Sequence, residues 1–487
     1  MSSRRLFIGT AIVALLSAPA QADTLREALV AAYQTNPTLS GARAAQRAID
    51  ENVAIAKADG RPSATSDFGF QENFLRSANS FTAPLRQSTA GGSIDVPIYS
   101  GGAVKNAIRA ARTRVEAGQL DLRATEASIF SNVVATYMDV IRDSAIVRLN
   151  RANVGVLSVN LEATGDRFET GDLTRTDVAQ SESRLEIAKS DLETVRASLI
   201  RSKENYIALV GHEPGDLEPP PPLPNMPETP DQAVDLALTY NPDLLAAKQR
   251  SDAAEFDIKT ARAGNKPRVS TYAQGRYLNY HGTLGGSVAG TTFIQEQSTA
   301  EVGIRATLPI YQGGRPAAQI RQAQARSGQA YEQIIAVERD VISQTRASYS
   351  SWRASERVIQ SSERAVAAAN LSLEGVRAEN SVGNRTILDI LNAEQELLNA
   401  QVQLVTARRN SYVAGFSLLA AMGRAEARDL GLEGGPLYDP DVNYDRVDDM
   451  FYDYQSDPNP EPQATRTVDT QAQKAEIEPL PVIPTRQ

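Results

Sequence analysis

The sequence predicts a mainly α-helical chain that also contributes four β-strands to a membrane β-barrel. Three observations lead to this prediction: the chain repeats its own pattern, each copy holds one very long helical run, and each copy holds two segments that alternate apolar and polar residues. The helical runs extend from Gly102 to about Thr170 and from Gly314 to about Ser381. At 1.5 Å per residue each would span roughly 100 Å, which is longer than a compact domain allows. We therefore expect a coiled-coil tunnel that continues from the strands.

The composition excludes several classes of site. The chain has 487 residues, with 50 Lys and Arg against 59 Asp and Glu, no cysteine, and two histidines, His212 and His281. The missing thiols exclude disulfides, cysteine zinc sites and iron–sulfur clusters. A net charge of −9 disfavours nucleic-acid binding, which needs a basic face. Neither histidine lies in a catalytic or metal-binding pattern, so we predict no enzyme activity, no cofactor and no metal site.

Residues 1–22 have the order of a secretory signal peptide. Two arginines precede an apolar run from Leu6 to Leu16, and Ala20-Gln21-Ala22 forms the expected cleavage box. The alternative is an N-terminal membrane anchor, but a span needs about 20 apolar residues and this run is shorter. No cysteine follows the box, so lipid anchoring is not expected. The sequence therefore predicts an exported protein without a lipid tail.

The rest of the chain is a tandem repeat. The pair Asn36-Pro37 returns as Asn241-Pro242, and the Val-Pro-Ile-Tyr segment at 96–99 returns as Leu-Pro-Ile-Tyr at 308–311. Four parts follow the signal peptide: a first copy at 23–218, a Pro-rich linker at 219–230, a second copy at 231–423 and a tail at 424–487. The tail is acidic and rich in proline, a composition that predicts disorder.

Both copies have the same order of elements: a helix, two strands, the very long helix and a closing helix. In the first copy the opening helix is predicted as one element over 24–60, and the closing helix over 174–210. The strands are expected at about 64–75 and 88–98 in the first copy and at about 269–280 and 299–310 in the second. We expect the two shorter helices of a copy to stack end to end beside its long helix.

The strands have the alternation of a membrane barrel, with one face for lipid and one for water. In the last strand, for example, Val302 and Ile304 point one way and Arg305 points the other. Four strands cannot close a barrel, and unpaired strand edges are not tolerated in hydrocarbon. Closure must therefore come from other copies: two chains would supply eight strands and three would supply twelve. The alternative is a non-channel coiled-coil protein of the cell envelope whose hairpins face solvent.

Two segments at corresponding points of the copies have a specific spacing of Gly, Thr, Arg and Asp. They read RFETGDLTRTDVAQ at 167–180 and VGNRTILDILNA at 382–393. These segments, and the order of elements over residues 24–423, resemble the TolC family of outer-membrane efflux proteins. The resemblance implies a homotrimer with a twelve-strand barrel in the lipid of a Gram-negative outer membrane. It also implies a helical tunnel in the periplasm, where the tail would lie too.

The same resemblance implies a function and partners. The trimer would be the exit duct of a tripartite efflux pump or of a type I secretion system, passing drugs or unfolded proteins to the exterior. Its partners would be a periplasmic adaptor (a membrane fusion protein) and an inner-membrane ABC or RND transporter.

The two segments also predict tight turns between helices. Gly171 and Gly383 follow the long helices, where glycine permits the left-handed conformation that ends a helix. Thr174 and Thr386 each stand three residues before an aspartate, which is the pattern of a helix N-cap. Helix capping alone would explain these four residues. The resemblance implies in addition that the turns dock the adaptor.

A gate at the turns is a further implication of the resemblance. In that family an arginine of the second turn is held by a Thr-Asp pair of the first, which closes the tunnel; here these residues are Arg385, Thr176 and Asp177. A ring of aspartates, one from each chain, lines the narrowed entrance, and Asp389 takes that position. Three carboxylates around one constriction would attract cations.

Two residues depart from the family pattern. Asn380 stands where the best-known members have a tyrosine of the closing network, and Asn392 stands where they have a second aspartate. The sequence therefore predicts a gate with fewer contacts and one charged ring instead of two.

Overall fold

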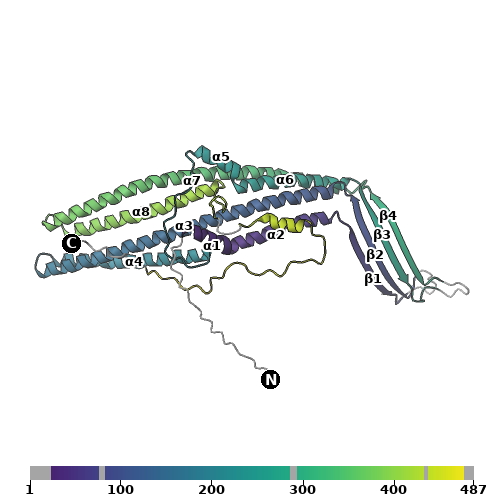
Figure 1. Ribbon diagram of the computed structural model, residues 1–487, viewed down its shortest axis with the longest axis horizontal. Coiled ribbons are helices and arrows are strands. Elements are labelled where there is room, and N and C mark those ends of the chain that lie inside the picture. Colours follow the sequence, from purple (N-terminus) through teal and green to yellow (C-terminus); the bar gives the residue numbers. More distant parts are fainter. Residues whose placement is uncertain (1–23, 76–82, 286–292, 433–436, 477–487) are drawn as a thin grey trace, which may run out of the picture.

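The computed structural model describes residues 24–75, 83–285, 293–432 and 437–476, so the predicted signal peptide lies outside the described residues. The chain is elongated, with a wall of helices at one end and a β-sheet at the other (Figure 1). No helix in these described ranges is both long and apolar enough to cross a membrane.

The opening helix of the first copy is broken in two. The structure has α1 at Leu25–Thr35 and α2 at Pro37–Ala58, so the prediction of one continuous helix over 24–60 is wrong. Pro37 has no backbone N–H and forces the preceding residue out of the helical region. Asn36 accordingly has φ −68° and ψ 124°, and its side chain caps α2 by accepting from the N–H groups of Thr38 and Leu39.

The second copy breaks in the same way. Helices α5 (Pro230–Tyr240) and α6 (Pro242–Arg262) are separated by Asn241, whose side chain accepts from the N–H of Leu244. A short 3₁₀ turn, Ala263–Asn265, then leads toward the sheet.

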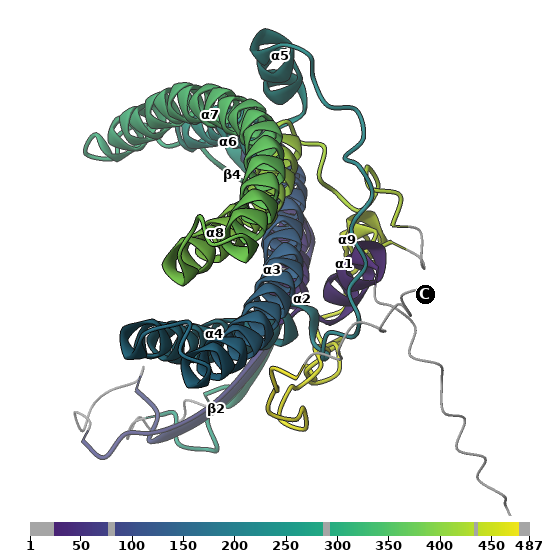
Figure 2. The ribbon, with the colours of Figure 1, turned by 90° about the vertical axis from the view of Figure 1, so that its left-hand side faces the viewer.

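The long helices have the predicted length. They are α3 (Ala103–Glu169) and α7 (Arg315–Ser381), of 67 residues each, followed by α4 (Arg175–Val210) and α8 (Ile387–Ala421). Figure 2 shows α4, α3, α8 and α7 in that order along an arc, with α1, α5 and the C-terminal segment on its convex side. As expected, α2 and α4 both pack along α3, and α6 and α8 both pack along α7.

The core lies where α1, α3, α4 and α8 meet. Its fully buried side chains include Phe130 and Tyr137 of α3, Tyr206 of α4 and Leu419 of α8. Burying each of them contributes about 1.5–3 kcal/mol, so the middle of the wall is the best-anchored part of the chain.

The four predicted strands are confirmed, within three residues at each end. They are β1 (Ser63–Glu72), β2 (Arg86–Tyr99), β3 (Arg268–Asn279) and β4 (Glu296–Thr307). They form one antiparallel sheet in the order β1-β2-β3-β4. Within the described part of the chain, β1 and β4 each have one edge without a partner strand.

The strand register separates an apolar face from a polar one. Paired residues of antiparallel strands share a face, and the pairs Phe68–Ala90, Ile94–Ala273 and Ala273–Val302 connect all four strands. By alternation this face carries most of the apolar strand residues: Ala64, Phe68, Phe70, Ala90, Ile94, Val96, Val269, Ala273, Tyr277, Ala300, Val302, Ile304 and Ala306. Small polar residues such as Ser66, Thr271 and Ser298 lie among them, and the charged pair Glu72–Arg86 lies at the end of the strands that is further from the helices. The opposite face carries mostly polar residues: Thr65, Asp67, Gln71, Gln87, Ser93, Asp95, Ser270, Tyr272, Gln274, Arg276, Thr299, Glu301 and Arg305.

The C-terminal segment is more ordered than its composition predicts. Residues 440–448 form α9 (Pro440–Asp448), which packs against α2, so the prediction of a disordered tail is wrong there. Lys57 of α2 forms an ion pair with Asp448 at 2.8 Å. Asn443 donates to Asp50 of α2 at 2.7 Å, and burial raises the pKa of the Asp50 carboxyl. Polar residues of the tail, Asp448 and Asn443, therefore have specific partners on α2, and the amino-acid composition of the tail gives no sign of these contacts.

Candidate functional site

The two turns between the long and closing helices both lie at the end of the wall opposite the sheet (Figure 1). We call them the first tip (167–177) and the second tip (379–389). At the first tip Gly171 has φ +85°, its N–H donates to Phe168 at 3.0 Å, and the N–H of Asp172 donates to Arg167 at 2.9 Å. Gly383, at φ +82°, begins the same pair of hydrogen bonds in the second tip. This is the Schellman ending that the glycines predict.

Each tip then begins its next helix with the same cap. The Thr174 hydroxyl donates to the Asp177 carboxylate at 2.7 Å, and the Asp177 N–H donates back to that hydroxyl at 3.3 Å. Thr386 and Asp389 repeat both distances. Hydrogen bonds from the Thr174 hydroxyl and N–H lower the pKa of Asp177, and those from the Thr386 N–H and hydroxyl lower the pKa of Asp389. Both carboxylates therefore stay charged at neutral pH.

Arg385 is bound within its own tip. Its Nε donates to Glu379 at 2.7 Å, and this hydrogen bond raises the pKa of the guanidinium. Asn380 Nδ2 donates to the Arg385 carbonyl at 2.7 Å. Among the described contacts of one chain, none joins Arg385 to Thr176 or Asp177. A single chain thus does not form the predicted lock, and Glu379 is a partner that the sequence did not indicate.

Asn392 has a different role from the missing aspartate. It accepts a hydrogen bond from Arg184 at 2.9 Å, which ties α8 to α4 just behind the tips. The sequence indicated only that a negative charge was absent here. The structure shows a cross-link between the two helical pairs in its place.

Glu394 is a buried carboxylate that sequence reasoning missed. Its side chain is 5% exposed. Asn160 Nδ2 of α3 lies 2.9 Å from both carboxylate oxygens, and Arg377 of α7 donates at 3.0 Å. One side chain of α8 therefore holds α3 and α7 together. The sequence does contain a sign of this burial: Glu394 lies on the same face of α8 as Leu391 and Leu398, which are both buried.

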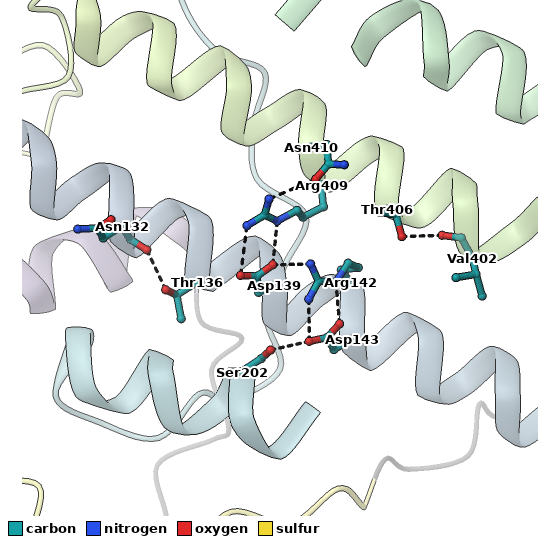
Figure 3. Close-up of polar contacts among 10 residues, drawn as sticks. All are labelled: Asn132, Thr136, Asp139, Arg142, Asp143, Ser202, Val402, Thr406, Arg409 and Asn410. Carbon is teal, nitrogen blue, oxygen red and sulfur yellow. Dashed lines mark hydrogen bonds and ion pairs between the residues drawn. The ribbon is translucent and has the colours of Figure 1, made fainter. Parts of the chain in front are cut away.

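A second polar network joins three helices further from the tips, as Figure 3 shows. Arg409 of α8 binds Asp139 of α3 through two nitrogens, at 2.8 and 3.2 Å. Asp139 also pairs with Arg142 at 2.7 Å, and Arg142 binds Asp143 through two further contacts. Ser202 of α4 donates to Asp143. Such partly buried, bidentate pairs orient helices more firmly than exposed ion pairs do.

The described residues contain no group of three or more His, Asp or Glu side chains placed to hold a metal ion. Of the two histidines, His281 contacts the Ser88 hydroxyl at 2.7 Å and His212 contacts the Glu213 carbonyl at 2.9 Å. The first contact joins a loop residue to strand β2, and the second is between neighbouring residues of one loop.

Most of the chain is similar in sequence to known proteins. The sequence model described as outer membrane efflux protein matches residues 28–212 and 233–424. The outer membrane efflux protein BepC of Brucella suis biovar 1 (strain 1330) is 34% identical over 433 residues, covering 89% of this chain and 92% of BepC. The outer membrane protein TolC of Escherichia coli (strain K12) is 28% identical over 309 residues, covering 62% of this chain and 63% of TolC. The crystal structure of the outer membrane protein VceC from Vibrio cholerae shares the fold, with a TM-score of 0.69 at 23% identity over 82% of this chain and 96% of VceC.

These matches decide against the alternative of an envelope coiled-coil protein without a channel. They cover the helical wall, both tips and the strands. The matching family consists of transport proteins and not of enzymes. The chain belongs to the outer membrane efflux protein family and is an exit duct of the Gram-negative outer membrane.

Proposed function

We propose that the duct is a homotrimer in which β4 of each chain pairs with β1 of the next, closing a twelve-strand barrel. The observation that carries this proposal is the sheet itself. Its apolar face is exposed, with Phe68 82% and Val302 81% accessible, while its two outer edges have no partner in the described chain. An apolar face suits lipid, and unpaired edges in lipid must be closed by other copies. The polar face, with Asp67 and Arg305, then lines the pore.

The helices would continue this pore. The arc of α4, α3, α8 and α7 covers part of a ring (Figure 2), and three such arcs complete a tunnel. A helix of 67 residues spans about 100 Å at 1.5 Å per residue. This length suits a wall that crosses the periplasm from the barrel, with the tips and the tail on the periplasmic side.

The tips would form the gate of this tunnel. In the trimer Arg385 would bind Thr176 and Asp177 of the neighbouring chain. The Arg385 side chain and its own-chain partner Glu379 are both half-exposed, so a second chain can reach the guanidinium. Asp389, kept charged by its cap, would supply one carboxylate to a ring of three. We expect Asp389→Asn to weaken block of the channel by trivalent cations. Equal blocking constants in both proteins would remove the ring from the proposal.

The tips would also meet the partners. Gly171, Thr174, Gly383 and Thr386 form two exposed turns at the far end of the wall, where a periplasmic adaptor would dock. The adaptor would join the duct to an inner-membrane ABC or RND transporter, for efflux of drugs or for type I secretion of unfolded proteins. The naming of BepC as an efflux protein supports the first of these.

Cysteine cross-linking tests the barrel directly, because the chain has no cysteine of its own. One cysteine replaces Gly69 in β1, and a second scans positions 299–305 of β4. The proposal predicts that at least one pair yields covalent dimers and trimers on oxidation. The control pairs the β1 cysteine with Gln274→Cys in β3, which the sheet places two strands away. Monomers at every β4 position, or a ladder beyond three, would contradict the trimer.

A further inference from the structure

The C-terminal segment carries an exposed aromatic cluster where it turns back along the molecule. After α9 the chain passes the end of α2, next to the start of β1, and then runs back toward α4 (Figure 1). We call Phe451, Tyr452 and Tyr454 the tail apex. The rings of Phe451 and Tyr452 stack with centroids 4.2 Å apart, and all three side chains are well exposed.

Specific contacts fix the apex beside the sheet. Arg61, which stands two residues before β1, donates to the Met450 carbonyl at 2.5 Å. Lys57 Nζ lies 2.8 Å from the Asp448 carboxylate and donates to the Asp448 backbone carbonyl, also at 2.8 Å. Further along, the N–H of Gln473 donates to Glu204 of α4 at 3.0 Å. The tail therefore runs from α9 to the base of the sheet and back, and its apex is the part nearest the strands.

Other exposed apolar residues lie at the same level of the molecule. They flank the points where β2 leads into α3 and where β4 leads into α7, and we call them the helix-proximal rim: Ile98, Tyr99, Ile310 and Tyr311. The apolar face of the sheet ends at this rim. The tail apex lies at the level of this rim, beside the start of β1.

The chemistry of the apex suits the boundary of a bilayer. Aromatic rings with a polar group, such as tyrosine, favour the headgroup region, where one end is apolar and the other wet. Asp449 and Asp453 lie on either side of the Phe451–Tyr452 pair and would keep the segment out of hydrocarbon. We propose, on the basis of the proposed function, that the tail apex binds the periplasmic leaflet of the outer membrane as a surface anchor beside the barrel.

Tryptophan quenching tests this anchor, because the chain has one tryptophan, Trp352. In a Trp352→Phe background, Tyr452→Trp reports on the apex, Val302→Trp on the apolar face of the sheet, and Val468→Trp on an exposed part of the tail further along. Each full-length variant is reconstituted in bilayers of ordinary lipid or of lipid brominated near the headgroup end of its chains. The anchor predicts a loss of emission in brominated lipid for Tyr452→Trp and Val302→Trp, with Val468→Trp unchanged.

The outcomes separate the two proposals. Quenching at Val302→Trp but not at Tyr452→Trp would overturn the anchor and leave the barrel intact. Quenching at neither position would overturn both. Protection of Tyr452→Trp from aqueous acrylamide without bromine quenching would show that protein, and not lipid, covers the apex. If Val302→Trp does not fold, Ile304→Trp on the same face replaces it.

Discussion

The two long helices have the same length and the same place in their repeats, yet they are buried very differently. α3 buries a side chain on nearly every turn of its middle section, whereas α7 buries few. Figure 2 shows the reason: α3 lies inside the arc between α4 and α8, and α7 lies at its end. In the proposed trimer, α7 would present this exposed surface to the next chain.

The repeat identifies that surface. On α3, Asp139 and Asn160 are 21 positions apart, three heptads, and both contact α8. Positions 146 and 153 share their stripe. The matching stripe of α7 consists of Ser351, Val358, Ala365 and Ser372, and every one of these residues is exposed in the single chain. We expect α4 of the neighbouring chain to cover this stripe, as α8 covers the stripe of α3.

The largest effect, on trimer formation, is expected from a charge introduced into that stripe of α7. Val358→Asp would bury a carboxylate between chains and should prevent trimer formation while leaving the single chain folded. Native mass spectrometry and circular dichroism measure both properties. The control is Leu371→Asp: Leu371 is 70% exposed, and its counterpart on α3, Val159, remains 63% exposed although α8 is present. Loss of trimers with Leu371→Asp, or normal trimers with Val358→Asp, would contradict the assignment.

A smaller effect, on the stability of the single chain, is expected from removing the Glu394 side chain that connects α3 and α7. Glu394→Ala would leave the Asn160 amide and the Arg377 guanidinium without their acceptor, which should cost about 1–3 kcal/mol of unfolding free energy. Urea denaturation of the detergent-solubilised protein measures this. Glu396→Ala, on the exposed face of α8, is the control and should change stability by less than about 0.5 kcal/mol. Equal losses in the two variants would show that the tie does not hold the wall.

The smallest effect is a local loss of helix capping at the two tips at acidic pH. Hydrogen bonds hold the pKa of Asp177 and Asp389 below the ordinary value of 3.8. The caps therefore contribute fully above that value and are lost as the pH falls through the lower folded pKa. Hydrogen exchange, corrected for its intrinsic rate, should show the first turns of α4 and α8 opening below pH 3.8. Asp177→Asn should remove this acid dependence from α4 only, and unchanged protection in acid would refute it.

The sequence predicted those parts of the molecule that depend on local rules. The strands follow from period-two alternation, and both tips follow from Gly171, Gly383 and the Thr-x-x-Asp caps, since each needs only neighbouring residues. The break at Asn36 is local too, because Pro37 keeps the preceding residue out of the helical conformation. An X-Pro step is better taken as a helix boundary.

Other features depend on contacts between distant segments. Glu394 is buried only because α3 and α7 converge on α8, and its partner Asn160 is 234 positions away. The docking of α9 on α2 requires Asp50 and Asn443 to meet across 393 positions. The composition of the tail is polar and therefore predicts disorder. It contains no information on which residues elsewhere in the chain will pair with those polar groups.

A duct closed at its tips is tested by the single-channel conductance of the purified protein in a planar bilayer. We expect small currents from the native chain and larger ones from Arg385→Ala, because removal of the guanidinium releases the tips. Arg353→Ala removes an exposed arginine that pairs with Glu356 within α7 and should conduct as the native protein does. No current from folded trimers, or the same conductance in all three proteins, would contradict a duct that is closed at its tips.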